Sequence, residues 1–226
     1  MWKEFIQAWR SDNLLNQAWE RSYDMLAISR DMFVESTRVL RTTDGADVSL
    51  NIRKQDKKIN RYEREVRRKV MTHCSIGGSG IIGGMVLTSI VIDIERIGDY
   101  TKNILELAIR HPKRLVVDDF ESELTEVEKY ITIQFENIID ILKTSDEAQA
   151  RKMIKTYRKE IKETCDAIVN QFIGGEVSGI PVDTATAMAL YARYLKRISS
   201  HLTNILTSVI NPFERIGFKE KKQNQL

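Results

Sequence analysis

Apolar side chains recur every three or four residues over most of the chain, and charged side chains fill the positions between them. This spacing is typical of long amphipathic α-helices. The chain has only 3 Pro and 11 Gly, and most of the glycines lie in two short stretches, so long segments contain no helix breaker. We therefore predict an all-α fold.

Glycine, proline and polar clusters divide the chain into six predicted helices. Their approximate ranges are 12–43, 47–73, 82–110, 118–144, 146–172 and 181–211. Asp44-Gly45 separates the first two, and Pro112 ends the third. Within the third helix, one face is apolar and is the predicted core; it carries Ile90, Ile97, Ile104 and Ala108.

Two of these helices share a short repeated pattern. Segments 96–105 and 197–206 both read Arg-Ile, five residues, then Asn-Ile-Leu. Each segment lies in the last helix of a set of three, and the preceding helices have similar lengths. A duplicated three-helix unit explains this most simply. We predict two tandem three-helix bundles, with residues 1–112 in the first and residues 113–226 in the second.

Oxygen-bearing side chains gather on one face of the third helix, within about 80° of arc. They are Glu95, Asp99, Asn103 and Glu106. A second set lies on one side of the second helix and consists of Asp56, Asn60 and Glu63. Such oxygen-rich clusters suit magnesium, manganese or ferric iron. An acidic stripe opposite a core face is also typical of solvated surface, and the spacing leaves both interpretations open.

The runs at 94–104 and 56–63 resemble the signatures of the PhoU family of phosphate-transport regulators. This resemblance implies two three-helix bundles, each able to hold a metal cluster on paired acidic residues. Carried over by position, Glu95, Asp99 and Asp56 match the family's acids, and Asn60 stands where a carboxylate is expected. We predict one metal site on these four residues, for Mg, Mn, Fe or Zn.

The second unit departs from the family pattern. Lys196 replaces the first acid of the motif, and Ser200 replaces the aspartate. In the fifth helix, Arg158 and Lys162 lie near the positions of the expected carboxylates, although a one-residue shift makes the alignment uncertain. A lysine among the ligands repels a cation. We therefore predict no metal site in the second unit.

The resemblance implies a non-enzymatic regulator of phosphate uptake or phosphate signalling. Its expected partners are a phosphate transporter component or a sensor kinase. The sequence leaves undecided whether the chain forms a homodimer. Its expected location is the cytoplasm, extending to the inner face of the membrane. Two other classes stay open: a metal-dependent phosphoester hydrolase using a metal-bound water, and an adaptor for a membrane surface or nucleic acid.

The adaptor hypothesis depends on a basic stripe along the second helix, within about 100° of arc. Its members are Arg53, Lys54, Lys57, Arg61, Arg64 and Arg68. The stripe suits an anionic lipid surface, nucleic acid or an acidic partner. The competing interpretation is a solvated face whose charges pair with Asp56, Glu63 and Glu65. No aromatic residues alternate with the basic ones, which argues against single-stranded nucleic acid.

The uncharged stretch 75–92 is rich in glycine, and we interpret it as a connection that leads into a buried helix, not as a membrane span. The start of the chain lacks a secretory-signal pattern, and its apolar residues Trp2, Phe5, Ile6 and Trp9 are expected to pack on the bundle. His201 is expected at the surface or at a helix cap.

Overall fold

The computed structural model describes residues 13–77, 79–111 and 113–220, and within them the regular structure is helical, without a strand. The first unit consists of α2 (Asn13–Thr42), α3 (Ile52–Ser75) and α4 (Ile81–Arg110). The second consists of the 3-10 turn η1 (Asp118–Phe120), α5 (Glu121–Thr144), α6 (Glu147–Thr156), the π-helical turn η2 (Tyr157–Ile161), α7 (Lys162–Ile173) and α8 (Val182–Ile210). A 3-10 turn, η3 (Phe213–Arg215), follows α8. The predicted all-α class and the two-unit organisation are confirmed.

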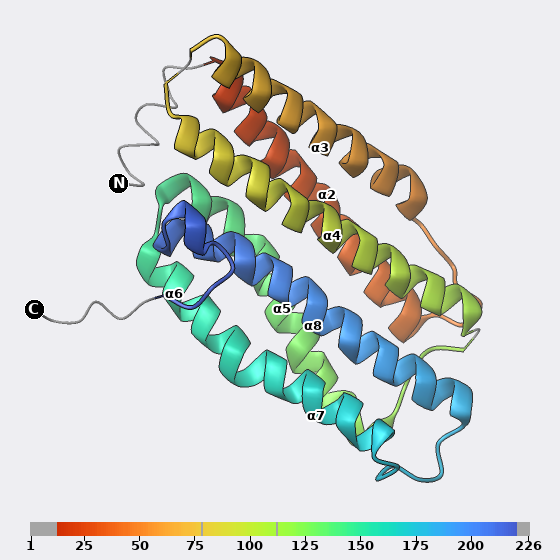
Figure 1. The fold of residues 1–226 in the computed structure, drawn as a ribbon. Helices are drawn as coiled ribbons and strands as arrows, with labels where there is room; N and C mark the ends of the chain where they lie inside the picture. Colours follow the sequence, from red (N-terminus) through yellow and green to blue (C-terminus); the bar gives the residue numbers. More distant parts are fainter. Residues whose placement is uncertain (1–12, 78, 112, 221–226) are drawn as a thin grey trace, which may run out of the picture.

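The long helices run side by side, and α4 and α8 lie in the middle of the molecule (Figure 1). Each of these two helices packs on the other helices of its own unit and also on its counterpart across the boundary. The predicted core face of α4 is buried: Ile90, Ile97 and Ile104 are inaccessible to solvent and Ala108 is nearly so. The hydrophobic core extends through both units as one cluster.

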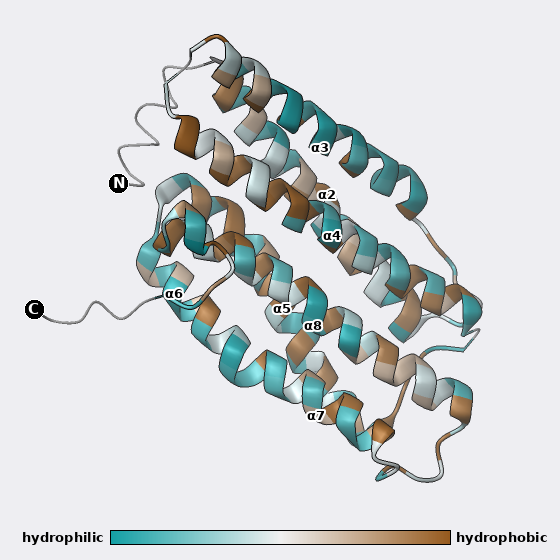
Figure 2. Cartoon of the chain, in the orientation of Figure 1, coloured by the Kyte–Doolittle hydropathy of each residue, from teal (hydrophilic) through white to brown (hydrophobic). Residues whose placement is uncertain are grey.

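Helix α3 is the most polar long helix, and only one narrow side of it is apolar (Figure 2). Ile52, Ile59 and Val66 are buried along that side, and the rest of the helix surface is largely charged. Because these apolar positions recur every seven residues, α3 presents a single seam to α2 and α4.

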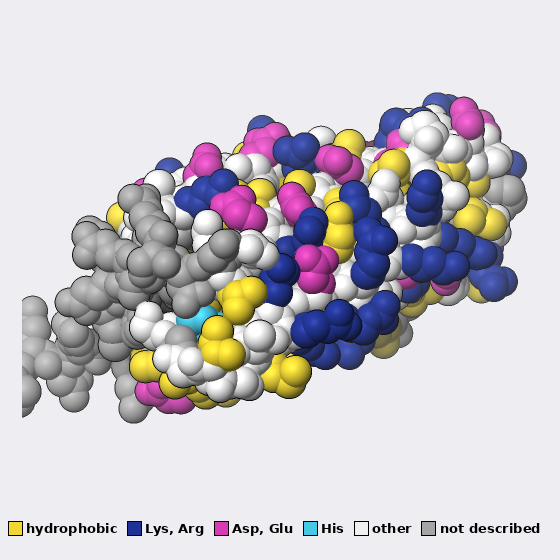
Figure 3. All heavy atoms as spheres, turned by 90° about the horizontal axis from the view of Figure 1, so that it is seen from above, with side chains coloured by type: hydrophobic (Ala, Val, Ile, Leu, Met, Phe, Trp, Pro, Cys, Tyr) yellow, Lys and Arg dark blue, Asp and Glu magenta, His cyan; other side chains and the backbone are white. Residues whose placement is uncertain are grey.

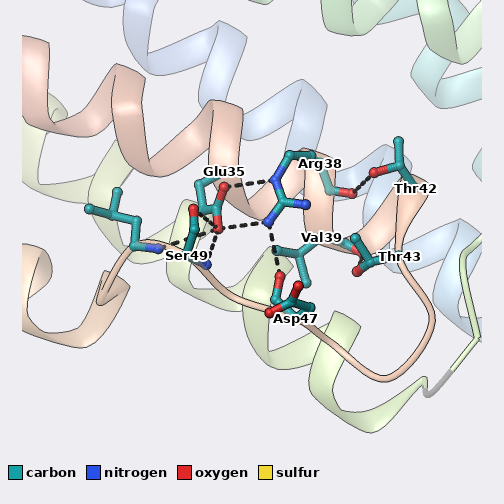
Figure 4. A network of polar contacts seen from close by, with 8 residues as sticks. Glu35, Arg38, Val39, Thr42, Thr43, Asp47 and Ser49 are labelled. Carbon is teal, nitrogen blue, oxygen red and sulfur yellow. Dashed lines mark hydrogen bonds and ion pairs between the residues drawn. The ribbon is translucent and has the colours of Figure 1, made fainter.

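The connection between α2 and α3 is held by one carboxylate, and for this reason α3 starts later than predicted. Glu35 on α2 accepts hydrogen bonds from the Ser49 backbone N–H (2.5 Å), the Ser49 hydroxyl (2.8 Å) and Arg38 Nε (2.9 Å) (Figure 4). Residues 43–51 therefore form a non-helical connection that is held against α2. Helix α3 begins only at Ile52, after the Asn51 side chain caps the Lys54 N–H at 2.9 Å.

The second helix of the second unit is not the uninterrupted α-helix that we predicted for 146–172. The π-helical turn η2 separates α6 from α7. A π turn accommodates an extra residue, which accounts for the one-residue shift in the alignment of the two units. Glycines also shape α4: Gly80 precedes it with φ of 78°, and a Cβ on Gly84 would lie 2.9 Å from Val70 Cγ1 of α3.

No helix of the described residues is long and apolar enough to cross a membrane. The uncharged stretch 75–92 forms the end of α3, a short connection and the first part of α4. The prediction for Trp2, Phe5, Ile6 and Trp9 lies outside the described residues. Cys74 and Cys165 are both free thiols.

Candidate functional site

The candidate site lies along the border between α3 and α4. Gly98 allows the two helices to approach closely, because a Cβ there would lie 3.1 Å from Ile59 Cδ1. The polar side chains beside this contact are thereby brought to the edge of the α3–α4 seam. They come from Asp56 and Glu63 on α3, and from Glu95 and Asp99 on α4.

Lys102 joins the two helices at this border. Its Nζ lies 3.3 Å from Asp56 Oδ2 and 3.1 Å from Asp99 Oδ1. All three side chains are partly buried, with exposed fractions of 26%, 14% and 31% for Lys102, Asp56 and Asp99. The structure therefore brings Asp56 and Asp99 onto one shared cation. That cation, however, is an ammonium group of the chain itself.

The charge balance at Lys102 agrees with this arrangement. Burial alone would lower the pKa of the Lys102 ammonium, but the hydrogen bond that Lys102 donates to Asp99 and the negative charge of Asp56 raise it above its ordinary value. Lys102 is therefore charged at neutral pH. It neutralises carboxylates that would otherwise repel each other across the α3–α4 seam.

Glu95 and Asn60 complete the predicted set and lie beside the Lys102 bridge. Burial is the largest cause that raises the pKa of the Glu95 carboxyl, and the negative charge of Asp99 adds to it, with smaller contributions from Glu63 and Asp56. Asn60 is half-buried on α3, and its side chain makes no hydrogen bond within the described residues.

The donors as arranged fit an ammonium group and not a metal ion. The position between Asp56 and Asp99 is taken by Lys102 Nζ, and a metal would have to displace it. Within 13–77, 79–111 and 113–220, no group of three or more His, Cys, Asp and Glu side chains is placed to hold a metal. The metal site on Asp56, Asn60, Glu95 and Asp99 stays a prediction, with Lys102 as its competitor.

The second unit has a smaller counterpart of this bridge. Lys196 on α8 donates a short hydrogen bond to Asp166 on α7. Lys196 stands where Glu95 stands in the first unit, and Ser200 stands where Asp99 does. Both units thus pair a lysine of the third helix with an aspartate of the second, but only the first unit surrounds its lysine with further carboxylates.

A polar cluster between α4 and α8 joins the units, and no motif in the sequence points to it. Asp93 Oδ1 lies 2.6 Å from His201 Nδ1 and accepts a hydrogen bond from Asn204 Nδ2 at 3.1 Å. Tyr100 stacks on the His201 ring at 5.7 Å and accepts a hydrogen bond from Arg197 Nε. His201 was expected at the surface or at a cap, and that prediction was wrong because the two repeated segments pack against each other.

A second inter-unit contact is formed by a buried arginine. Arg41, at the end of α2, is 8% exposed and lies 2.6 Å from Glu121 and 3.0 Å from Glu128 of α5. Tyr191 of α8 donates a hydrogen bond to Glu128 at 2.7 Å. Burial raises the pKa of Glu128, although Tyr191 and Arg41 act in the opposite direction. Arg41 therefore supplies the positive charge that compensates the carboxylates of Glu121 and Glu128 in the second unit.

The geometry describes a two-unit helical protein whose third helices meet in the middle and carry the repeated motif. The PhoU domain model matches the chain twice, over residues 23–108 and 124–209. The chain therefore belongs to the PhoU domain family.

Two solved structures have a similar fold. The phosphate transport system regulatory protein PhoU from Streptococcus pneumoniae aligns with a TM-score of 0.74 at 14% identity, covering 87% of this chain and 93% of that one. PhoU from Pseudomonas aeruginosa aligns with a TM-score of 0.73 at 19% identity, covering 87% and 95%. At these identities the likeness concerns the fold. A search of curated proteins gave no significant match.

Proposed function

We propose that this chain is a non-enzymatic regulator of phosphate uptake or phosphate signalling, which acts by binding a transporter component or a sensor kinase. The observation that carries the proposal is the double PhoU domain match, one copy in each unit. The fold likeness to a protein described as a phosphate transport system regulatory protein supports it. The expected place of action is the cytoplasm, at the inner face of the membrane.

The arrangement of the polar residues favours binding over catalysis. The Lys102 bridge connects α3 to α4, and the Asp93–His201 cluster connects α4 to α8. In a hydrolase that used the α3–α4 carboxylates, the metal that carries the attacking water would have to displace Lys102 Nζ from between Asp56 and Asp99. We therefore propose that these groups fix the relative placement of helix faces that a partner recognises.

The test is phosphate uptake in the source cells with the gene deleted and then restored. Deletion is expected to change either the uptake rate of labelled phosphate or the abundance of phosphate-responsive transcripts, and restoration is expected to reverse the change. Normal uptake and normal transcripts in both low and high phosphate would contradict the proposal. Hydrolysis of phosphoesters by the purified chain with manganese would favour the hydrolase alternative.

A further inference from the structure

The outward face of α3 is the strongest unassigned feature of the molecule. Six side chains, all exposed, form what we name the α3 cationic face: Arg53, Lys54, Lys57, Arg61, Arg64 and Arg68. Placed at 100° per residue, they lie within about 100° of arc, opposite the buried seam, and no carboxylate falls in that arc. Lys and Arg side chains form a band over this side of the molecule (Figure 3).

The carboxylates that were the possible local partners of this face are occupied elsewhere. Asp56 lies against Lys102, Glu63 pairs with Arg67 at 2.8 Å, and Glu65 pairs with Arg21 at 3.3 Å. In the described part of the chain, none of the six cations has a carboxylate partner. The interpretation as a locally neutralised face is therefore not supported by the ion pairs.

The net positive charge of α3 is also larger than that of the whole chain. Residues 52–75 contain nine Lys and Arg against three Asp and Glu, a net charge of +6, whereas the whole chain has +3. The remaining residues together are therefore net negative. An anionic partner would therefore be attracted most strongly to α3.

Apolar side chains continue the α3 cationic face at its C-terminal end. Met71 falls within the same arc and is 65% exposed, and Ile76 at the end of the helix is 70% exposed. Ile81 and Ile82, at the start of α4, are also exposed. In the view over α3, hydrophobic side chains gather at one end of the basic band (Figure 3).

We propose that this face docks on a membrane surface that contains anionic lipid. Helix α3 lies parallel to the surface, its basic side chains contact the headgroup phosphates, and Met71 and Ile76 enter the interface between headgroups and acyl chains. The apolar end distinguishes lipid from nucleic acid, because a phosphate backbone offers apolar side chains no favourable environment. Tyr62, the one aromatic residue of α3, is covered by Arg21 at 4.2 Å and is not free to stack on a base. This proposal does not rest on the proposed regulatory function.

The test is partition of the full-length chain onto vesicles, made of phosphatidylcholine alone or of phosphatidylcholine mixed with phosphatidylglycerol. The variant carries Lys57→Glu, Arg61→Glu and Arg64→Glu. The matched control carries Lys152→Glu, Lys155→Glu and Lys159→Glu, exposed residues on the counterpart helix of the second unit with the same change in net charge. Circular dichroism checks that both variants fold.

We expect the wild type to bind the anionic vesicles and not the neutral ones. The α3 variant should bind at least about a hundredfold more weakly, while the control variant should bind within about threefold of wild type. Met71→Ser with Ile76→Ser, which removes the apolar side chains without adding charge, should weaken binding about tenfold and leave its salt dependence unchanged. Three results would overturn the proposal: no binding to anionic vesicles, equal losses in both triple variants, or tighter binding to duplex DNA or an acidic peptide than to the vesicles.

Discussion

The two units share a topology but differ most in their second helices. Helix α3 is regular over its whole length and carries a net charge of +6. Its counterpart, residues 147–173, is interrupted by the π turn η2, contains six Lys and Arg against four Asp and Glu, and carries a net charge of +2. Both units therefore pack a second helix on their own bundle, but only the second helix of the first unit, α3, has a strongly charged surface.

The third helices also differ, and again the first unit has the larger set of charged side chains. Lys102 on α4 pairs with two aspartates and lies near further carboxylates, whereas among the described residues Lys196 on α8 pairs with Asp166 alone. What remains common to α4 and α8 is the repeated pattern with its buried isoleucines, Ile97 and Ile104 in α4 and Ile198 and Ile205 in α8. The comparison indicates that the buried apolar positions of the third helices are kept in both units, while the α3–α4 border and the outer face of α3 differ from their counterparts.

The largest expected effect tests how far the first unit depends on the second. Arg41→Met leaves Glu121 and Glu128 without their cation, and Glu128 is already poorly solvated. Removing one partner of a buried ion pair leaves the other charge buried and unpaired, so that its desolvation is no longer compensated. We therefore expect the free energy of unfolding to fall by about 3 kcal/mol. Urea unfolding followed by circular dichroism measures it.

The control for Arg41 is Arg30→Met, which removes an exposed arginine from the same helix. It should change the free energy of unfolding by less than about 0.5 kcal/mol. Equal effects from the two substitutions would mean that the α2–α5 contact contributes nothing specific.

A smaller effect is expected at the α2–α3 connection, which has no equivalent in the second unit. Hydrogen bonds from Arg38 are the largest cause that lowers the pKa of Glu35 to about 2, assisted by Ser49. Glu35→Gln is expected to cost about 2 kcal/mol at neutral pH. The counterpart by repeat alignment, Glu136, is exposed, and Glu136→Gln should be neutral.

The Glu35 contribution has a defined pH window. Its folded pKa lies below the ordinary value of 4.5, so the stabilisation is complete above 4.5 and is lost as the pH falls toward about 2. The difference between wild type and Glu35→Gln should therefore shrink over this range in unfolding experiments. A difference that stayed constant from pH 6 to pH 2 would show that ionisation of Glu35 does not provide the stabilisation.

The helices and the core could be predicted from the sequence because they depend on local periodicity. The spacing of Ile90, Ile97 and Ile104 places them on one side of a helix whatever its neighbours are. The start of α3 was missed because it depends on Glu35, a residue of another helix, whose hydrogen bonds outweigh the local helix preference of residues 47–51.

The candidate site could be predicted only in part. Helical spacing placed Glu95 and Asp99 on one face, and the pairing of two helices brought Asp56 to it. Lys102 was not recognised, although it lies three residues after Asp99 and can therefore reach it on a helix. Asp93 and His201 were missed for a different reason: their contact joins residues 108 positions apart and requires knowledge of how α4 and α8 pack.

The metal prediction can be tested by removing its competitor. Lys102→Met frees Asp56 and Asp99 from the ammonium and leaves Glu63 and Glu95 nearby, so we expect manganese affinity to rise about tenfold, which corresponds to about 1.4 kcal/mol. Lys196→Met, which leaves only Asp166, should produce no such rise. Isothermal titration calorimetry measures both. Wild-type affinity equal to that of Lys102→Met would mean that Lys102 does not compete with a metal.

The smallest expected effect should have opposite signs in the two units, at residues that occupy equivalent positions. The pKa of Glu95 is raised in the folded state, so its ionised form is disfavoured there, and stability falls as the pH rises from the unfolded pKa through the folded one. Glu95→Gln removes this penalty and should stabilise the chain by about 0.5 kcal/mol at neutral pH, an effect that vanishes once Glu95 is protonated in both states.

Lys196→Gln removes an attraction to Asp166 and should destabilise the chain by a similar amount. Thermal unfolding at pH 7 and at pH 3 separates these results, and a destabilising Glu95→Gln would show that the Glu95 carboxylate is more fully compensated by Arg96 and Lys102 than the geometry implies.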